Sequence, residues 1–356
     1  MADYASLTGL NVVTGFLGSG KTTLLQGLLR SPRLRDTAVL INEFGEVGLD
    51  HQLLQHVSET TLLLDNGCLC CAVRGDLQQA LRDLLSQRSR GTIPYFGRVV
   101  IETSGLADPV PIAYTLLADP VIQHHFRLGN IVATVDAVSA GHTLDNYPES
   151  VKQIAVADRL ILTKADMADS QDVSSLCTRL RRLNGSAPIL QLALGAVPDD
   201  GLLLDDIHRQ DGKAREIDNW LRPSGPDPDG PLGHEHGSDV HSFTVCVDRP
   251  LDWTAFGIWL TMLLNRHGEH ILRVKGLLNV AGVSTPVLIN GVQHIVHPPS
   301  HLEAWPDDDR RSRLIFIVRG LDEAKIRASR DVFNALANPD VQARSSGRVP
   351  VDVGGS

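Results

Sequence analysis

A glycine-rich stretch near the N-terminus constrains this chain more than any other feature. Residues 11–23 read NVVTGFLGSGKTT and contain the pattern G-x-x-x-x-G-K-[ST]. Apolar residues before the loop predict a strand, and leucines at helical spacing after it predict a helix. Because strand, loop and helix agree, the stretch indicates a phosphate-binding P-loop and not a simple glycine-rich turn.

Each part of this loop has an expected task. Glycines let backbone N–H groups turn toward phosphate oxygens. Lys21 supplies a positive charge for the β- and γ-phosphates, and Thr22 offers a hydroxyl to Mg²⁺. The helix that begins there directs its positive end at the phosphates. The residues expected to hold the nucleotide are Gly15, Phe16, Leu17, Gly18, Ser19, Gly20, Lys21, Thr22 and Thr23.

A later strand ends in polar residues that suit the same site. Glu102 closes an apolar run, where a second carboxylate on the Mg²⁺ side is expected, although a solvent-facing acid is the simpler alternative. Gly105 could bring its N–H close to the γ-phosphate. We therefore expect Lys21, Thr22 and Glu102 to be the catalytic residues.

Residues 163–166, TKAD, follow a further strand and resemble the guanine signature N-K-x-D. In that signature the aspartate accepts hydrogen bonds from the ring N–H and the exocyclic amine of guanine, and adenine presents the opposite pattern. Here Thr163 replaces the asparagine, while Lys164 and Asp166 keep their places. The segment favours GTP over ATP.

Three cysteines lie close together in the sequence NGCLCC: Cys68, Cys70 and Cys71. Thiolates are soft ligands that favour Zn²⁺ or Cu(I). Three sulfurs leave one tetrahedral position for a carboxylate or an outside ligand, which indicates an exchangeable metal. A buried apolar cluster and a redox pair are the alternatives. Two histidine sets stay open as further ligands: His234, His236 and His241, and His294, His297 and His301.

Composition argues against several classes of protein. A net charge of −9 over 356 residues disfavours a nucleic-acid binder or a binder of anionic membranes. No run approaches the roughly 18 apolar residues of a membrane span, and the N-terminus lacks a signal-peptide pattern. Five cysteines, three of them clustered, do not form a disulfide framework. A reducing compartment, the cytoplasm, is therefore expected.

Apolar runs alternate with helical patterns through the first half of the chain. This alternation predicts an α/β fold with a mostly parallel, doubly wound sheet. The polar segment after Asp136 is expected to be a turn-rich connection, and single strands are expected over 271–280 and 287–296. The expected boundaries are 1–221 for the P-loop domain, 222–241 for a linker rich in proline, glycine and aspartate, 242–337 for a smaller α+β domain and 338–356 for a disordered tail.

Taken together, the chain resembles the CobW family of metal-handling GTPases. The motifs that carry the resemblance are GFLGSGKTT (15–23), NEFGEVGLD (42–50), NGCLCC (66–71), ETSGLADP (102–109) and TKAD (163–166). The resemblance implies that Cys68, Cys70 and Cys71 bind the metal and that Glu46, on a switch segment, can approach it. The chain departs from some members at Ile41, where they carry a glutamate, and in lacking a long histidine tract.

The resemblance further implies a GTPase that uses Mg²⁺ and delivers a metal ion to a client metalloprotein. Zn²⁺ is the expected metal, with Co²⁺ as the alternative ion. One rival is a GTP-dependent activator of a single metalloenzyme or of cobalamin assembly. A second rival is an ordinary ATPase or kinase with an incidental cysteine cluster. The client and the oligomeric state, a homo-oligomer included, are left open by the sequence.

Overall fold

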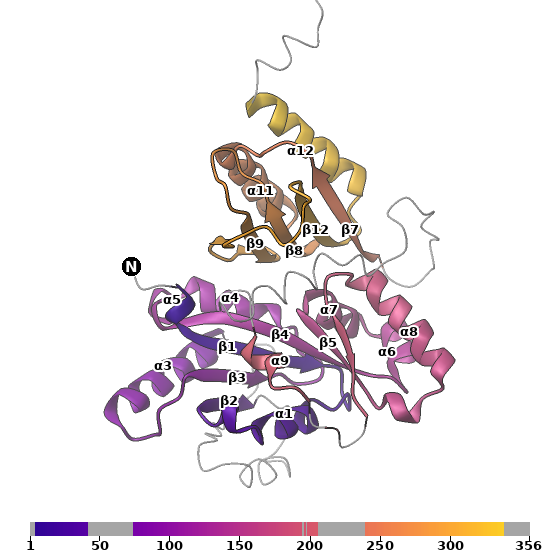
Figure 1. Ribbon diagram of the computed structural model, residues 1–356. Coiled ribbons are helices and arrows are strands. Elements are labelled where there is room, and N and C mark those ends of the chain that lie inside the picture. Colours follow the sequence, from indigo (N-terminus) through magenta and orange to yellow (C-terminus); the bar gives the residue numbers. More distant parts are fainter. Residues whose placement is uncertain (1–3, 42–73, 194–195, 197, 206–238, 338–356) are drawn as a thin grey trace, which may run out of the picture.

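Two β-sheets organise the chain, one in each half (Figure 1). The computed structural model describes residues 4–41, 74–193, 196, 198–205 and 239–337. The cysteine segment NGCLCC, the segment 42–50 and most of the expected linker lie outside these residues.

The first sheet is parallel and has the strand order β2-β3-β1-β4-β5-β6. Its strands are β1 (Thr8–Gly15), β2 (Thr37–Ile41), β3 (Arg98–Glu102), β4 (Phe126–Asp136), β5 (Arg159–Thr163) and β6 (Ile189–Gln191). Strand order reverses around β1, which lies between β3 and β4. In open α/β sheets ligands bind at the carboxyl ends of the strands at such a reversal.

Helices cover both faces of this sheet, so its strands are apolar on both sides. Along β1, Leu10 and Val12 face one hydrophobic cluster, and Val13 faces another. The first cluster includes side chains of α3 (Arg74–Arg90), α4 (Val110–Ala118), α7 (Pro148–Val156) and α8 (Ser170–Leu183). The second includes α1 (Lys21–Leu29) and α9 (Gly201–Leu204). The remaining short helices are η1 (Tyr4–Ser6), η2 (Pro32–Leu34), α5 (Pro120–His125), α6 (Ala140–Asn146) and η3 (Ala165–Met167).

The second sheet is antiparallel, in the order β10-β9-β8-β12-β7, with β11 paired to β9. Its strands are β7 (Val240–Val247), β8 (Ile271–Leu278), β9 (Val287–Val292), β10 (Ile295–Val296), β11 (Ser300–His301) and β12 (Ser312–Arg319). Helices α11 (Trp253–His267) and α12 (Glu323–Ala337) pack on it through an apolar core. The predicted fold class, a P-loop sheet followed by a smaller α+β domain, is confirmed.

Three details differ from the sequence expectations. The strand expected over 287–296 is two strands, because the chain turns at Gln293, whose φ is 52°. The connection after Asp136 is not mainly turns, since it forms the helices α6 and α7. Strand β7 already begins at Val240, near the end of the expected linker.

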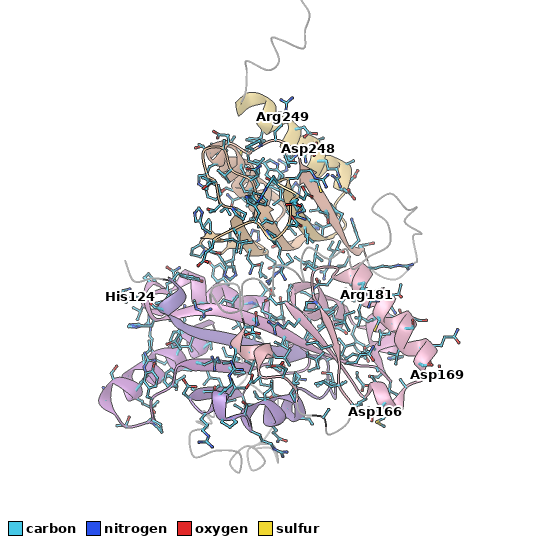
Figure 2. All side chains as sticks on the ribbon, viewed as in Figure 1. His124, Asp166, Asp169, Arg181, Asp248 and Arg249 are labelled. Atoms are coloured by element: carbon cyan, nitrogen blue, oxygen red, sulfur yellow. The ribbon has the colours of Figure 1, made fainter. Side chains whose placement is uncertain are left out.

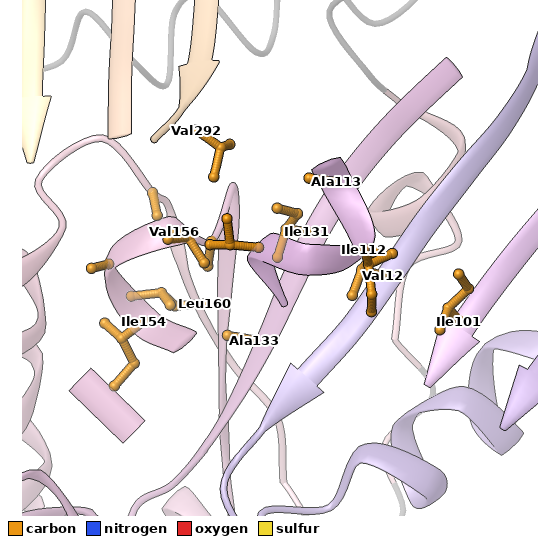
Figure 3. Close-up of a cluster of buried hydrophobic side chains, with 14 of the residues drawn as sticks. Val12, Ile101, Ile112, Ala113, Ile131, Ala133, Ile154, Val156, Leu160 and Val292 are labelled. Carbon is orange, nitrogen blue, oxygen red and sulfur yellow. The ribbon is translucent and has the colours of Figure 1, made fainter. Parts of the chain in front are cut away.

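The two domains share part of one core. Leu272, Val292 and Ile317 of the second sheet belong to the same buried cluster as α4 and α7. Figure 3 shows Val292 in the same cluster of buried side chains as Ala113 and Val156. The contact joins β8 to α7 and β10 to α4.

A buried ion cluster lies in the same contact. Asp158, just after α7, pairs with Arg273 and, at 3.2 Å, with Lys275, both from β8. Arg273 and Lys275 are each 1% exposed. The carboxylate of Asp158 also accepts a hydrogen bond from the backbone N–H of Ile131 in β4. The domains are therefore joined by charge as well as by apolar packing.

Candidate functional site

The P-loop connects β1 to α1 in a conformation that requires glycine at two positions. Gly15 has a φ of 139°, and a Cβ there would lie 2.4 Å from the carbonyl oxygen of Thr134. Gly20, the residue before α1, has a φ of 89°, in the left-handed region. The loop therefore turns tightly enough to present its N–H groups at the N-terminus of α1, as an anion site needs.

Lys21 is held over the loop. Its Nζ donates hydrogen bonds of 3.1 Å to the carbonyl oxygens of Gly15 and Phe16. The side chain is 9% exposed. An ammonium group fixed at this position lies where the sequence predicts a charge for the β- and γ-phosphates.

Thr22 and Glu102 meet at the carboxyl edge of the sheet, although 80 residues separate them. The hydroxyl of Thr22 donates a 2.6 Å hydrogen bond to Oε1 of Glu102. Glu102 is 2% exposed. A hydroxyl and a carboxylate are oxygen ligands of the kind that Mg²⁺ prefers. The donor set present in the chain therefore fits the ion that the P-loop implies.

Two threonines hold the P-loop against the sheet. The hydroxyls of Ser19 and Thr134 lie 2.6 Å apart in a hydrogen bond. The hydroxyl of Thr163 donates a 2.8 Å hydrogen bond to the carbonyl oxygen of Ser19. Thr163, where the guanine signature has asparagine, thus still contacts the P-loop. Thr134 was not identified from the sequence, because its role depends on β4 lying beside β1.

Lys164 and Asp136 form the wall beside the P-loop. Lys164, whose φ is 56°, donates to the carbonyl oxygen of Gly18 at 3.0 Å and pairs with Asp136 at 2.7 Å. Burial would raise the pKa of Asp136, but hydrogen bonds from Lys164 and the Val138 N–H lower it. Asp136 therefore stays ionised and anchors the lysine. The sequence showed only that Asp136 ends a strand.

Asp166 lies on the short helix η3, exposed at the edge of the first domain that points away from the second (Figure 2). Gly105 packs directly on the P-loop, because a Cβ at this residue would lie 2.6 Å from the backbone nitrogen of Leu17. The structure thus gathers the predicted residues of three segments, the P-loop, the end of β3 and the end of β5, at one edge of the sheet, together with Asp136 from the end of β4.

The expected metal ligands Glu46, Cys68, Cys70 and Cys71 lie outside the described residues, as do His234 and His236. Within the residues that the structure covers, no three histidine, cysteine, aspartate or glutamate side chains gather as a metal site. His294, His297 and His301 therefore do not form the ligand set that the sequence left open. His294 instead contacts the carbonyl oxygen of Leu264 through Nδ1 at 3.0 Å.

No helix in the described part of the chain combines the length and the apolar character needed to span a membrane.

Comparison with known proteins identifies both domains. Residues 10–191 match the family model for the CobW/HypB/UreG nucleotide-binding domain. Residues 240–332 match the cobalamin synthesis protein cobW C-terminal domain.

Individual relatives extend over nearly the whole chain. The zinc chaperone YjiA of Escherichia coli is 33% identical over 323 residues, which cover 90% of this chain and 96% of the relative. The zinc-regulated GTPase metalloprotein activator 1 of Schizosaccharomyces pombe is 34% identical, with 88% and 82% covered. The crystal structure of Zn(II)-bound YjiA GTPase from E. coli superposes with a TM-score of 0.69 at 31% identity, covering 92% of this chain and 99% of that one.

Proposed function

The chain belongs to the CobW family of nucleotide-binding proteins, and on this premise we propose that it is a GTPase that carries zinc to a client metalloprotein. The observation that carries the GTPase half is the contact between Thr22 and Glu102 beside a P-loop. The zinc half is supported by the sequence NGCLCC and by the names of the zinc chaperones and zinc-regulated GTPases among its relatives.

Hydrolysis of GTP forms a bond between a water oxygen and the γ-phosphorus, and breaks the bond to the bridging oxygen between the β- and γ-phosphorus atoms. Lys21 stabilises the negative charge that develops on the phosphates. Thr22 and Glu102 would hold Mg²⁺, which supplies charge neutralisation at the β- and γ-oxygens. Gly105, packed on Leu17, can direct its N–H toward the γ-phosphate.

We assign Cys68, Cys70 and Cys71, with Glu46 nearby in the sequence, to the metal that the protein carries. Zinc is the cargo in this function, and thiolates are ligands that bind it well. The thiolates must stay reduced, which fits the cytoplasmic location we propose. Because Glu46 belongs to the proposed switch segment, GTP and metal are expected to influence each other's affinity.

The guanine assignment has a direct test. Asp166→Asn should weaken GTP binding and narrow the preference over ATP, because the variant loses the charged acceptor for the guanine N–H groups. Calorimetric affinities for GTP and ATP measure this. Asp172→Asn, an exposed aspartate on α8, is the matched control and should leave both unchanged. A wild type that binds ATP as tightly as GTP would contradict the assignment.

Cobalt tests the metal site, because Co²⁺ bound to thiolates absorbs strongly and oxygen-bound Co²⁺ does not. Reduced wild type should show thiolate bands that Zn²⁺ displaces and that Cys70→Ala removes. Cys246→Ala, at an exposed cysteine of the second domain, is the control and should keep them. Zn²⁺ should change GTP affinity by about 5- to 150-fold, the range of typical coupling. If both the thiolate bands and the coupling are absent, the metal assignment is wrong, while the GTPase assignment still stands.

A second candidate is a GTP-dependent activator that remodels one metalloenzyme. The relative named zinc-regulated GTPase metalloprotein activator 1 favours it. An activator raises the activity of a client that already holds its metal, whereas a chaperone acts only on the metal-free client. Assaying a client in both forms separates the two.

A further inference from the structure

Gln153, in helix α7, reaches from one face of the sheet to the segment that follows β3. Its Nε2 donates hydrogen bonds of 3.1 Å to the carbonyl oxygen of Gly105 and of 3.0 Å to that of Ala107. The residue is 1% exposed. Because one side-chain amide donates to two backbone carbonyls, Gln153 fixes the position of the segment 105–107.

This segment, residues 105–107, follows β3 and contacts the P-loop. Gly105 packs on the backbone of Leu17, with no room for a side chain between them. Gln153 also lines a small cavity together with Gly15, Phe16 and Leu17. Its Oε1 accepts no hydrogen bond within the described part of the chain. The side chain therefore lies directly behind the place where the P-loop meets Gly105.

The same helix is fastened at its other end to the second domain. The carbonyl oxygen of Val156 accepts a 3.0 Å hydrogen bond from Nη1 of Arg273. Asp158, two residues further, pairs with Arg273 and Lys275. Lys152, next to Gln153, pairs with Asp108 at 2.5 Å and adds a second link to the segment after β3. Helix α7 thus connects the segment 105–108 to strand β8.

We propose that Gln153 is a positioning residue for GTP hydrolysis: by holding the carbonyl of Gly105 it fixes the backbone of this residue so that its N–H points toward the γ-phosphate, and α7 makes this position depend on the second domain. The proposal rests on the GTPase function proposed above. Because only GTP carries a γ-phosphate, loss of the two hydrogen bonds should affect GTP and spare GDP. An effect on the overall fold would weaken both nucleotides alike.

The test uses the full-length protein with Gln153→Met, which keeps the length of the side chain and removes both donors. We expect kcat for GTP to fall about 10- to 100-fold, since a displacement of about 1 Å near reacting groups can cost 10²-fold. Affinity for a non-hydrolysable GTP analogue should fall about 10-fold, while affinity for GDP changes by less than about twofold. Gln171→Met, at an exposed position of α8, is the matched control and should behave as wild type.

Gln153→Asn provides a second variant if the methionine variant does not fold, because it keeps the amide but is one methylene too short to reach both carbonyls. The same split between GTP analogue and GDP is expected. Unchanged kcat and analogue affinity in the folded variant would overturn the role of Gln153, as would equal losses for both nucleotides. If instead the proposed GTPase function is wrong, the wild type itself will not hydrolyse GTP, and this result is distinct from a failure of the Gln153 proposal.

Arg273→Met tests the link to the second domain. Like Gln153→Met, it should lower kcat without changing the affinity for GDP. If the two residues act together, the double variant should lose less kcat than the product of the two single fold-losses. Arg313→Met, whose partner Asp307 lies within the second domain at 3.0 Å, is the control. Wild-type kcat in folded Arg273→Met would overturn the dependence on the second domain.

Discussion

Lys21→Ala is expected to abolish measurable GTP hydrolysis, with a loss of at least about 10²- to 10³-fold in kcat. Removal of one donor that stabilises transition-state charge typically lowers kcat by this factor. Lys21 donates hydrogen bonds to the backbone carbonyls of Gly15 and Phe16 in the loop and does not belong to the apolar clusters, so the alanine variant should keep the apolar core intact. A phosphate-release assay measures the loss, and circular dichroism with urea unfolding checks the fold.

Lys325→Ala is the matched control, since Lys325 is exposed on α12 in the second domain. It should hydrolyse GTP at the wild-type rate. A folded Lys21→Ala variant that retains more than about a tenth of wild-type kcat would contradict the assigned role of the lysine.

Asp158→Asn should lower the free energy of unfolding by about 3–5 kcal/mol. Asparagine keeps the shape of the side chain but removes the negative charge between Arg273 and Lys275, which are both buried. Breaking a buried ion pair by removing one partner has a cost of this size, because the other charge stays buried without compensation. Urea unfolding at pH 7 measures the difference.

The matched control is Asp145→Asn. Asp145 pairs with Arg179 at 2.6 Å on the surface, where side-chain exposures are 59% and 32%. Loss of an exposed pair should cost less than about 1 kcal/mol. Equal effects of the two substitutions would show that the buried cluster does not stabilise the protein as proposed.

The same cluster predicts an acid dependence. Burial would raise the pKa of Asp158, but Arg273, Lys275 and the Ile131 N–H lower it from 3.8 to about 2. A lowered folded-state pKa gives stability that is present above pH 4 and is lost as the pH falls toward 2. Wild type should therefore lose more stability than Asp158→Asn across this window.

The sequence predicted the parts of the site that lie within single motifs. The P-loop, Glu102 and the segment 163–166 could be found because local chemistry and strand position constrain them. Their gathering at one edge followed from the parallel sheet. The structure adds the contact between Thr22 and Glu102, which spacing alone could not show.

Other residues could not be predicted, because their role arises only from tertiary contacts. Gln153 sits in a stretch that reads as polar, and its two acceptors lie 48 and 46 residues away. Asp136 becomes informative only when β4 lies beside β5 and Lys164. Helix α7 differs from the expected turn-rich connection because Pro148 and its polar neighbours resemble a turn. Proline is nevertheless well suited to the first turn of a helix, where it lies here.

The shared core between the domains limits how this protein can be recombined. A gene fragment encoding only the second sheet would leave Leu272, Val292 and Ile317 without their apolar partners, and Arg273 and Lys275 without their acid. Such a fragment is therefore not expected to fold independently of its own first domain. Grafting it onto another nucleotide-binding domain should succeed only where the recipient supplies an acid after its equivalent of α7 and an apolar surface beside it; otherwise the two halves must be exchanged as a pair.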